Sequence, residues 1–287
     1  MKLMKKGFNF SQDGTGNRLV YHLQGCNMRC PWCSNPEGIS REGSFLIHKE
    51  KLIDSVCPHG NIRLGTIDRR FCDECVAREC LNARRNQGIE FSCQELSVEE
   101  LVNEAVESRP LFFGGGGLTF TGGEPTLQFD QLLLAAKELC THGISLAIET
   151  NGTNPRLPLL FPYLDLLIMD FKHPDSEIHK KFTGVSNEQV KQNIEKAMNL
   201  HKNVLIRTPL INKFNAEKSV CGEFIEFYKQ FPLENTRFEL LKYHEYGRSK
   251  WELAGMEYKM TEGFVSEEIK PYFEAQYKAN GLTLVNT

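Results

Sequence analysis

The sequence predicts an α/β protein that folds as a partial (β/α)6 barrel, and three observations support this prediction. Apolar runs of strand length recur along the 287 residues. Helical patterns with their own start signals stand between these runs, as in a series of βαβ units. Polar motifs directly follow most of the runs. A doubly wound open sheet would produce the same periodicity, so it stays open as the alternative arrangement.

Six segments are expected to form the parallel strands, because each is a short apolar run bounded by turn residues. They are residues 17–24, 117–121, 144–150, 164–170, 203–211 and 236–244. Two of the intervening helices begin with the spacing of a capping box, Ser97 with Glu100 and Ser186 with Gln189. Apolar residues recur at helical spacing after both signals, which predicts a face packed on the sheet.

Residues 35–96 interrupt this alternation, and we expect them to form a small cysteine-rich module inserted into a barrel of residues 1–34 and 97–287. The segment has little regular periodicity. A loop of this length without structure of its own is uncommon in a compact domain, so something must order it. Its five cysteines make metal ligation the obvious candidate. They are Cys57, Cys72, Cys75, Cys80 and Cys93.

The charge balance excludes two classes of protein. Lys and Arg (34) nearly equal Asp and Glu (37), and no block of like charge stands out, which argues against nucleic-acid partners and a polybasic membrane anchor.

The start of the chain lacks an apolar signal segment, and the longest apolar run, residues 164–171, is too short to span a bilayer. We therefore expect a cytoplasmic protein. Its ten cysteines should stay reduced, with the clustered ones as metal ligands and Cys140 and Cys221 as buried small hydrophobes.

Three cysteines follow the first strand at C-x-x-x-C-x-x-C spacing: Cys26, Cys30 and Cys33. Thiolates suit zinc and iron-sulfur clusters. Three of them can hold three irons of a [4Fe-4S] cluster, and the fourth iron is then open to a substrate or cofactor. Zinc would need a fourth ligand, but His22 and His48 have no regular ligand spacing. The motif therefore favours a cluster.

Polar motifs stand at the ends of the other predicted strands. They are TFTGGEP (119–125), ETNG (149–152), MDFK (169–172), IRTP (206–209) and KYHEYG (242–247). Each alone is compatible with an ordinary strand-end turn. In a parallel barrel, however, the carboxyl ends of all strands share one face, so these motifs and the three cysteines are expected to meet in one pocket. His173 and His179 are expected on a solvated helix surface, and His59, His142 and His201, which show no convergent partners, are expected at the surface as well.

The motifs resemble those of a known superfamily. The three-cysteine motif with Trp32, the following SNPEG and the upstream SQDGTGNRLVYHLQGC resemble the radical S-adenosylmethionine (SAM) superfamily. TFTGGEP, LLIMDFKHPDSEIHKKFTGVSN and LLKYHEYGRSKWELAGMEY resemble, more closely, the glycyl radical enzyme activating enzymes, a group that includes the pyruvate formate-lyase activating enzyme. The likeness runs from Phe10 to Tyr258.

This resemblance implies a reaction. SAM would chelate the open iron through its amino and carboxylate groups and be cleaved reductively to methionine and a 5'-deoxyadenosyl radical. The radical would remove a hydrogen atom from a glycine Cα of a partner enzyme, and a reduced flavodoxin or ferredoxin would supply the electron. The resemblance also implies a barrel of the radical SAM type.

Individual residues match positions with roles in that group. Gly122, Gly123 and Glu124 match the loop at the SAM amino group, while Lys172 and Arg207 are expected to neutralise or grip a carboxylate. His244 matches a histidine near the ribose. The remaining matches are Asp13, expected to orient the incoming glycine loop, Asn151 in the cofactor pocket, and Glu149 with Asp170 at a monovalent-cation site. Glu149 departs from the usual Asp, and Thr15 and Asn17 depart from the usual D-G-P-G-I-R around Asp13.

The insert resembles the ferredoxin-like module of many such enzymes, which carries two C-x-x-C-x-x-C-x-x-x-C-P runs. Here only Cys57 remains of the first run, with Cys72, Cys75 and a displaced Cys80 of the second. In two-cluster ferredoxins the last cysteine of one run ligates the cluster of the other. The resemblance therefore implies one auxiliary [4Fe-4S] cluster on these four, with Cys93 as a spare that could replace Cys57 or Cys80 and zinc as the alternative metal.

Two other functions are compatible with parts of this pattern. A radical SAM enzyme that acts on a small metabolite would need no protein partner. An iron-sulfur electron carrier would need no SAM pocket, and the GGE, DFK and His244 motifs argue against it.

Overall fold

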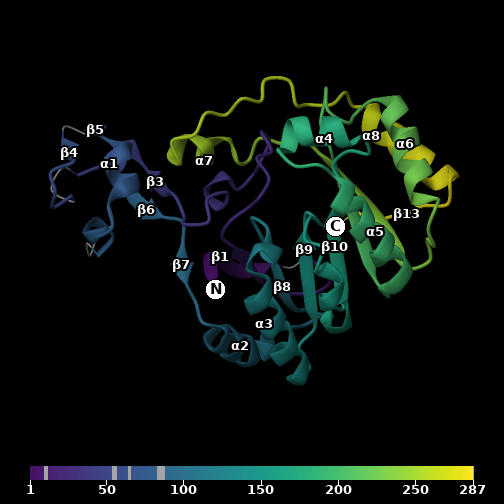
Figure 1. Ribbon diagram of the computed structural model, residues 1–287, viewed down its shortest axis with the longest axis horizontal. Coiled ribbons are helices and arrows are strands. Elements are labelled where there is room, and N and C mark those ends of the chain that lie inside the picture. The colour runs from purple at the N-terminus through teal and green to yellow at the C-terminus, as the bar shows by residue number, and fades with distance from the viewer. Residues whose placement is uncertain (10–11, 54–56, 64–65, 83–87, 287) are drawn as a thin grey trace.

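A computed structural model describes residues 1–9, 12–53, 57–63, 66–82 and 88–286. Phe10 and Ser11, where the resemblance begins, lie outside the described residues. Within these ranges the main sheet has nine strands (Figure 1). They are β1 (Lys2–Asn9), β2 (Arg18–Leu23), β7 (Gln94–Glu95), β8 (Gly117–Gly122), β9 (Leu146–Thr150), β10 (Leu166–Asp170), β11 (Val204–Leu210), β12 (Thr236–Lys242) and β13 (Thr283–Leu284).

The order of the strands in this sheet shows a barrel-type winding. From β2 onward, neighbours are parallel and follow chain order, β2-β8-β9-β10-β11-β12-β13, while β1 and β7 add antiparallel strands at one edge. All six predicted strands are confirmed. In a doubly wound sheet the order would reverse at a switch point, so the open-sheet alternative is wrong.

Helices cover the outer face of the sheet (Figure 1). The α-helices are α1 (Arg69–Glu74), α2 (Val98–Glu107), α3 (Phe129–Thr141), α4 (Ser176–Thr183), α5 (Glu188–Leu200), α6 (Lys218–Tyr228), α7 (Arg248–Leu253) and α8 (Ile269–Ala279). Short 3-10 helices are η1 (Pro36–Gly38), η2 (Lys49–Lys51), η4 (Glu79–Asn82), η5 (Arg109–Leu111), η6 (Pro125–Gln128) and η7 (Leu157–Tyr163). The main core lies between α2, α3, α5, α6, α8 and alternate strand residues such as Tyr21, Phe120 and Phe238.

One of the two predicted capping boxes is correct. Ser97 caps α2, and its side chain and that of Glu100 exchange hydrogen bonds with each other's backbone. The second prediction is wrong, because α5 begins one residue later, with Asn187 at the N-cap and no side-chain cap. The amide of Asn187 instead donates to the carbonyls of His173 (2.6 Å) and Pro174 (2.9 Å), which ties α5 to the loop after β10.

Burial differs from the sequence-based expectation at several isolated residues. Cys221 is buried as predicted, but Cys140 is exposed because it lies in the last turn of α3, at the margin of the buried face. His173, His179 and His201 are buried, not at the surface. Each contacts a backbone group: Asp175 N donates to His173 Nδ1, and ring nitrogens of His179 and His201 lie 2.8 and 3.1 Å from the carbonyl oxygens of Val185 and Leu164.

The insert has a small core of its own. Strands β3 (Phe45–Ile47) and β6 (Ile89–Phe91) pair antiparallel, as do β4 (Ile62–Arg63) and β5 (Thr66–Ile67). Phe45, Ile47, Ile62, Cys72 and Ile89 pack together, separate from the barrel core. The chain rejoins the main sheet at β7, which pairs with β1 just before the predicted boundary at residue 96. Among the described residues, no helix has the length and apolar character needed to cross a membrane.

Candidate functional site

A cavity of about 280 Å³ opens at the carboxyl ends of the parallel strands. The six parallel strands β2 and β8 to β12 contribute residues at or just beyond their last position, as expected for a parallel barrel. The described lining residues are Cys26, Met28, Cys30, Trp32, Cys33, Ser34, Asn35, Thr121, Gly122, Gly123, Glu149, Thr150, Asn151, Asp170, Lys172, Pro209, Ile211, Leu241, Lys242, Tyr243 and His244. The structure therefore brings the three-cysteine loop and most of the strand-end motifs together.

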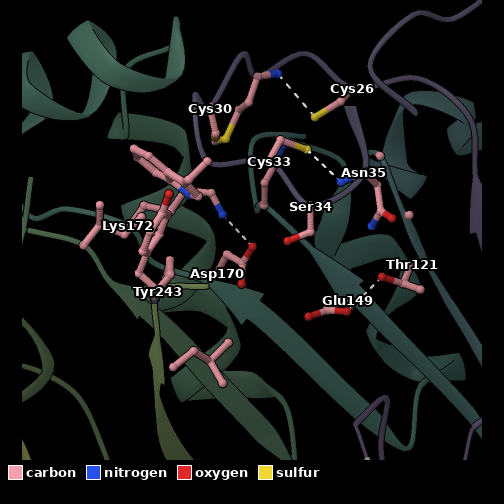
Figure 2. A pocket seen from close by; sticks show the side chains of 18 of the residues that line it. Cys26, Cys30, Cys33, Ser34, Asn35, Thr121, Glu149, Asp170, Lys172 and Tyr243 are labelled. Carbon is pink, nitrogen blue, oxygen red and sulfur yellow. Dashed lines mark hydrogen bonds and ion pairs between the residues drawn. The ribbon is translucent and has the colours of Figure 1, made fainter. Parts of the chain in front are cut away.

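The three cysteines lie on one side of this pocket, opposite the strands that carry Glu149 and Asp170 (Figure 2). The loop is held by backbone bonds from Gly25 N to Gly38 O (2.9 Å) and from Cys26 N to Ile39 O (3.0 Å). Two sulfurs accept backbone hydrogen bonds, Cys26 from Met28 N and Cys33 from Asn35 N, both at 3.4 Å. Such bonds stabilise thiolates.

Burial determines the protonation of these thiols. It raises the pKa of Cys26 to about 11 and that of Cys30 to about 12, and it also raises the pKa of Cys33. The positive charge of Lys172 acts in the opposite direction on all three. Without a metal the thiols thus stay protonated at neutral pH, and metal binding must release protons.

Lys172 is buried at the wall of the pocket, and its Nζ donates to Asp170 Oδ2 at 2.5 Å (Figure 2). Burial alone lowers the pKa of Lys172, but Asp170 and the nearby Cys30 raise it by more, so the net pKa is raised. The ammonium group therefore remains charged beside the cysteines and can compensate negative charge there.

Glu149 also faces the pocket and accepts from Thr121 Oγ1 at 2.8 Å and from Arg207 Nη1 at 2.7 Å. Arg207 lies behind it, 5% exposed, and is not among the described lining residues. Its Nε donates to Glu239 at 2.7 Å and its Nη2 to the carbonyl of Gln12. Burial lowers the pKa of Arg207, but the carboxylates of Glu149 and Glu239 outweigh this effect and raise it. The sequence predicts that Arg207 binds a ligand carboxylate. In the structure, its guanidinium group instead binds two carboxylates of the protein, those of Glu149 and Glu239.

Glu124 also differs from expectation, because it is fully buried and is not among the described lining residues of the pocket. Oε1 accepts from Thr126 N (3.0 Å), Thr126 Oγ1 (2.5 Å) and Thr150 Oγ1 (2.6 Å), and Oε2 accepts from Asn151 N at 2.7 Å. Burial raises its pKa, whereas these hydrogen bonds lower it. Glu124 thus joins the ends of β8 and β9, and positions Asn151, which does line the pocket.

Gly122 and Gly123 let the backbone line the pocket without side chains. A Cβ on Gly123 would lie 2.1 Å from the carbonyl oxygen of Gly25, and Gly122 has φ +118. Only glycine suits such a close approach and such a backbone angle. The cysteine loop and the GGE loop therefore lie in direct backbone contact.

His244 and Asp13 occupy different parts of the site. His244 lies on the exposed rim, where its ring stacks on Tyr246 at 4.3 Å and partial burial lowers its pKa. Asp13 is not among the described lining residues; it accepts from Asn9 Nδ2, and burial with the nearby charge of Glu149 raises its pKa. Asp13 thus lies outside the described lining, within electrostatic range of Glu149.

Several lining residues were not singled out from the sequence. Thr121, Ser34, Asn35 and Tyr243 all belong to the strand-end and cysteine-loop motifs named above, so their place in those motifs was a usable signal. The ring of Tyr243 is buried, and its hydroxyl pairs with that of Tyr258 at 2.5 Å.

The insert brings a second group of cysteines together. Cys57, Cys72, Cys75 and Cys80 line one small cavity with Phe45, Pro58, His59, Phe71 and Glu79. Asn61 Nδ2 donates to Cys72 Sγ at 3.2 Å. Cys93 lies elsewhere, next to Gly43 and Lys2. Among the described residues no three His, Cys, Asp or Glu side chains are grouped to hold a single metal ion.

A parallel barrel with three clustered cysteines at its carboxyl edge defines an iron-sulfur enzyme of the radical SAM class, and comparison with known proteins agrees. The model of the radical SAM superfamily matches residues 20–219. The (2S)-3-sulfopropanediol dehydratase activating enzyme of Klebsiella oxytoca is 32% identical, with 86% of this chain and 83% of the relative covered. The isethionate sulfite-lyase activating enzyme of Desulfovibrio desulfuricans is 33% identical, with 87% and 85% covered.

A solved domain of the pyruvate-formate lyase-activating enzyme from Bacteroides vulgatus is also similar, with a TM-score of 0.50 and 28% identity over 60% of this chain and 98% of that domain. The chain belongs to the radical SAM superfamily, and within it to the glycyl radical enzyme activating enzymes. Members of this superfamily use a [4Fe-4S] cluster and SAM, so these two cofactors come with the family. Membership among the activating enzymes argues against the metabolite and electron-carrier alternatives.

Proposed function

We propose that the pocket holds SAM against a [4Fe-4S] cluster ligated by Cys26, Cys30 and Cys33, and that the protein thereby installs a glycyl radical in a partner enzyme. One observation carries this proposal: the three thiols share a cavity with the ends of six parallel strands, β2 and β8 to β12. No fourth cysteine is among the described residues of that cavity, so the donor set fits a cluster with one open iron.

The bound cluster and SAM supply the electron transfer and the 5'-deoxyadenosyl radical. The side chains and backbone of the chain position these groups. Lys172 offers a positive charge beside the cysteines, which offsets the charge of the thiolates and of a ligand carboxylate. Gly122 and Gly123 offer backbone groups to the ligand. Trp32 packs on Phe214 (ring centroids 4.7 Å apart) and closes the apolar side, which helps to exclude water from a reactive radical.

Glu124 and Arg207 support the proposed site from behind, and His244 is placed to contact a ribose at the rim. Asp13, within electrostatic range of Glu149, would orient the incoming glycine loop. The monovalent cation expected at Glu149 and Asp170 would have to compete with Arg207 and Lys172 for the same carboxylates. We therefore leave this cation out of the proposed site.

We also propose an auxiliary [4Fe-4S] cluster on Cys57, Cys72, Cys75 and Cys80, with zinc as the competing metal. Their shared cavity and the donor from Asn61 to a sulfur support this assignment. Iron counting after anaerobic reconstitution tests it. We expect about eight irons per chain and about four after Cys72→Ser/Cys75→Ser, because each cluster holds four. A count of about four in both proteins would refute the auxiliary cluster.

A reduced flavodoxin or ferredoxin is the proposed electron donor. The proposed compartment is the cytoplasm, where the ten cysteines stay reduced.

The test of the whole function combines the reduced protein, SAM and a candidate glycyl radical enzyme without oxygen. We expect an EPR doublet from a glycyl radical in the partner. SAM cleavage without a protein radical in any candidate would contradict the proposed partner class.

A further inference from the structure

Helix α7 lies between the insert and the three-cysteine loop (Figure 1). It contacts β3 of the insert and also η1, which directly follows the loop. Neither the sequence motifs nor the proposed chemistry assigns this helix a role. Its side-chain contacts show what it could do.

The middle of α7 holds the Cys33 corner of the loop. The indole Nε1 of Trp251 donates to the carbonyl oxygen of Cys33 at 2.9 Å, and the ring is 9% exposed. Gly247, just before the helix, touches the same corner, since a Cβ there would lie 2.6 Å from Ser34 Cα. Ser34 and Asn35 line the pocket, so this contact places part of the pocket wall.

Lys250 adds an ionic tie from the same helix. Its Nζ lies 2.7 Å from Asn35 Oδ1 and 3.0 Å from Glu37 Oε1. Glu37 is 5% exposed, so this ion pair is partly desolvated. Trp251 and Lys250 together fix residues 33–37 through three side-chain contacts from one helical turn.

The C-terminal end of α7 is held by the insert. Arg69 of α1 donates through Nη2 to the carbonyl of Leu253 and through Nη1 to the carbonyl of Phe45 at 3.1 Å. A cation at the carbonyl end of a helix is a favourable arrangement. Arg69 lies three residues before Cys72, so the segment that carries an insert cysteine also anchors α7.

We propose that α7 couples the insert to the SAM site: Trp251 is a positioning residue that fixes the Cys33 corner, and Arg69 is the residue through which the insert holds α7. This inference rests on the proposed SAM site. Neither side chain is among the described lining residues. Substitution of Trp251 or Arg69 should therefore weaken the binding of SAM more than it slows turnover, because residues 33–35 are then no longer held in place by α7.

The kinetic test uses three variants of the reconstituted protein. Trp251→Phe keeps an aromatic ring but removes the N–H donor. Arg69→Gln removes the guanidinium group that binds the carbonyls of Leu253 and Phe45. Arg70→Gln is the matched control, on the exposed face of α1. SAM cleavage is measured with a chemical reductant and no partner. For Trp251→Phe we expect the KM for SAM to rise about fivefold, the value of one net hydrogen bond, with kcat nearly unchanged. Arg69→Gln should show a smaller rise and Arg70→Gln none.

A second measurement does not depend on activity. Hydrogen exchange of residues 33–38 in the metal-free proteins should be faster in Trp251→Phe and Arg69→Gln than in Arg70→Gln. Equal exchange and equal KM in all three variants would overturn the role of α7. If the unmodified protein fails to cleave SAM, the proposed function fails instead, while the exchange experiment still tests the coupling.

Discussion

Replacing Arg207 by Met distinguishes a residue that supports the pocket from one that binds the ligand. Arg207 is 5% exposed and lies between Glu149 and Glu239, the latter 2% exposed. Met keeps an apolar stem but removes the cation that both carboxylates share. We therefore expect a loss of stability as the main effect.

The magnitude follows from burial. Removing one partner of a buried ion pair costs about 3–5 kcal/mol, because the other charge stays desolvated. The side chain of Glu149 is 22% exposed, so most of the cost arises at Glu239. We expect the free energy of unfolding to fall by about 3–4 kcal/mol near neutral pH. Arg207→Met/Glu239→Gln should recover part of this loss, because the buried charge is gone.

Urea unfolding of the metal-free, reduced protein measures these differences through the fluorescence of Trp32 and Trp251. An unchanged free energy of unfolding together with a raised KM for SAM would refute this reasoning. That result would instead mean that Arg207 binds the ligand directly, as the sequence had suggested.

Three further predictions concern the cysteines and a buried histidine. Cys30→Ala should abolish SAM cleavage and remove about four irons per chain while leaving the insert's metal in place, as iron analysis and EPR can show; retained cleavage would contradict the cluster assignment. Asn61→Leu removes the donor to Cys72 Sγ, so the reduction potential of the insert's cluster should fall by about 40 mV in an EPR-monitored titration. No shift would argue against a cluster at this sulfur. Burial lowers the pKa of His179 from 6.5 to about 4, so its neutral form stabilises the fold above about pH 6.5, and this contribution is lost as pH falls towards 4. By about pH 5 the loss from His179 amounts to about 2 kcal/mol. His179→Gln should flatten this part of the pH profile of stability, and a profile no flatter than that of the exposed His142→Gln would show the assignment to be wrong.

Much of the fold was predictable because its signals are local. Each parallel strand is a short apolar run, and the Ser97 capping box needs only four consecutive residues. The Ser186 signal failed because Asn187 makes tertiary bonds to the loop after β10, which displaced the helix start. Burial of His173, His179 and His201 was missed for the same reason, since their partners or covering elements are set by the fold.

The sequence by itself determined the class of the protein and the place of its site. Cys26, Cys30 and Cys33 follow a strand, and parallel strands put their carboxyl ends on one edge, so the pocket followed from topology. Only the tertiary structure decided what each polar side chain does there. Glu124 accepts hydrogen bonds from Thr126 and Thr150, and Arg207 binds Glu149 and Glu239. Helix α7, which lies far away in the sequence, holds the Cys33 corner. Local patterns cannot encode such contacts, because each depends on which buried donor finds an acceptor from another element once the barrel has closed.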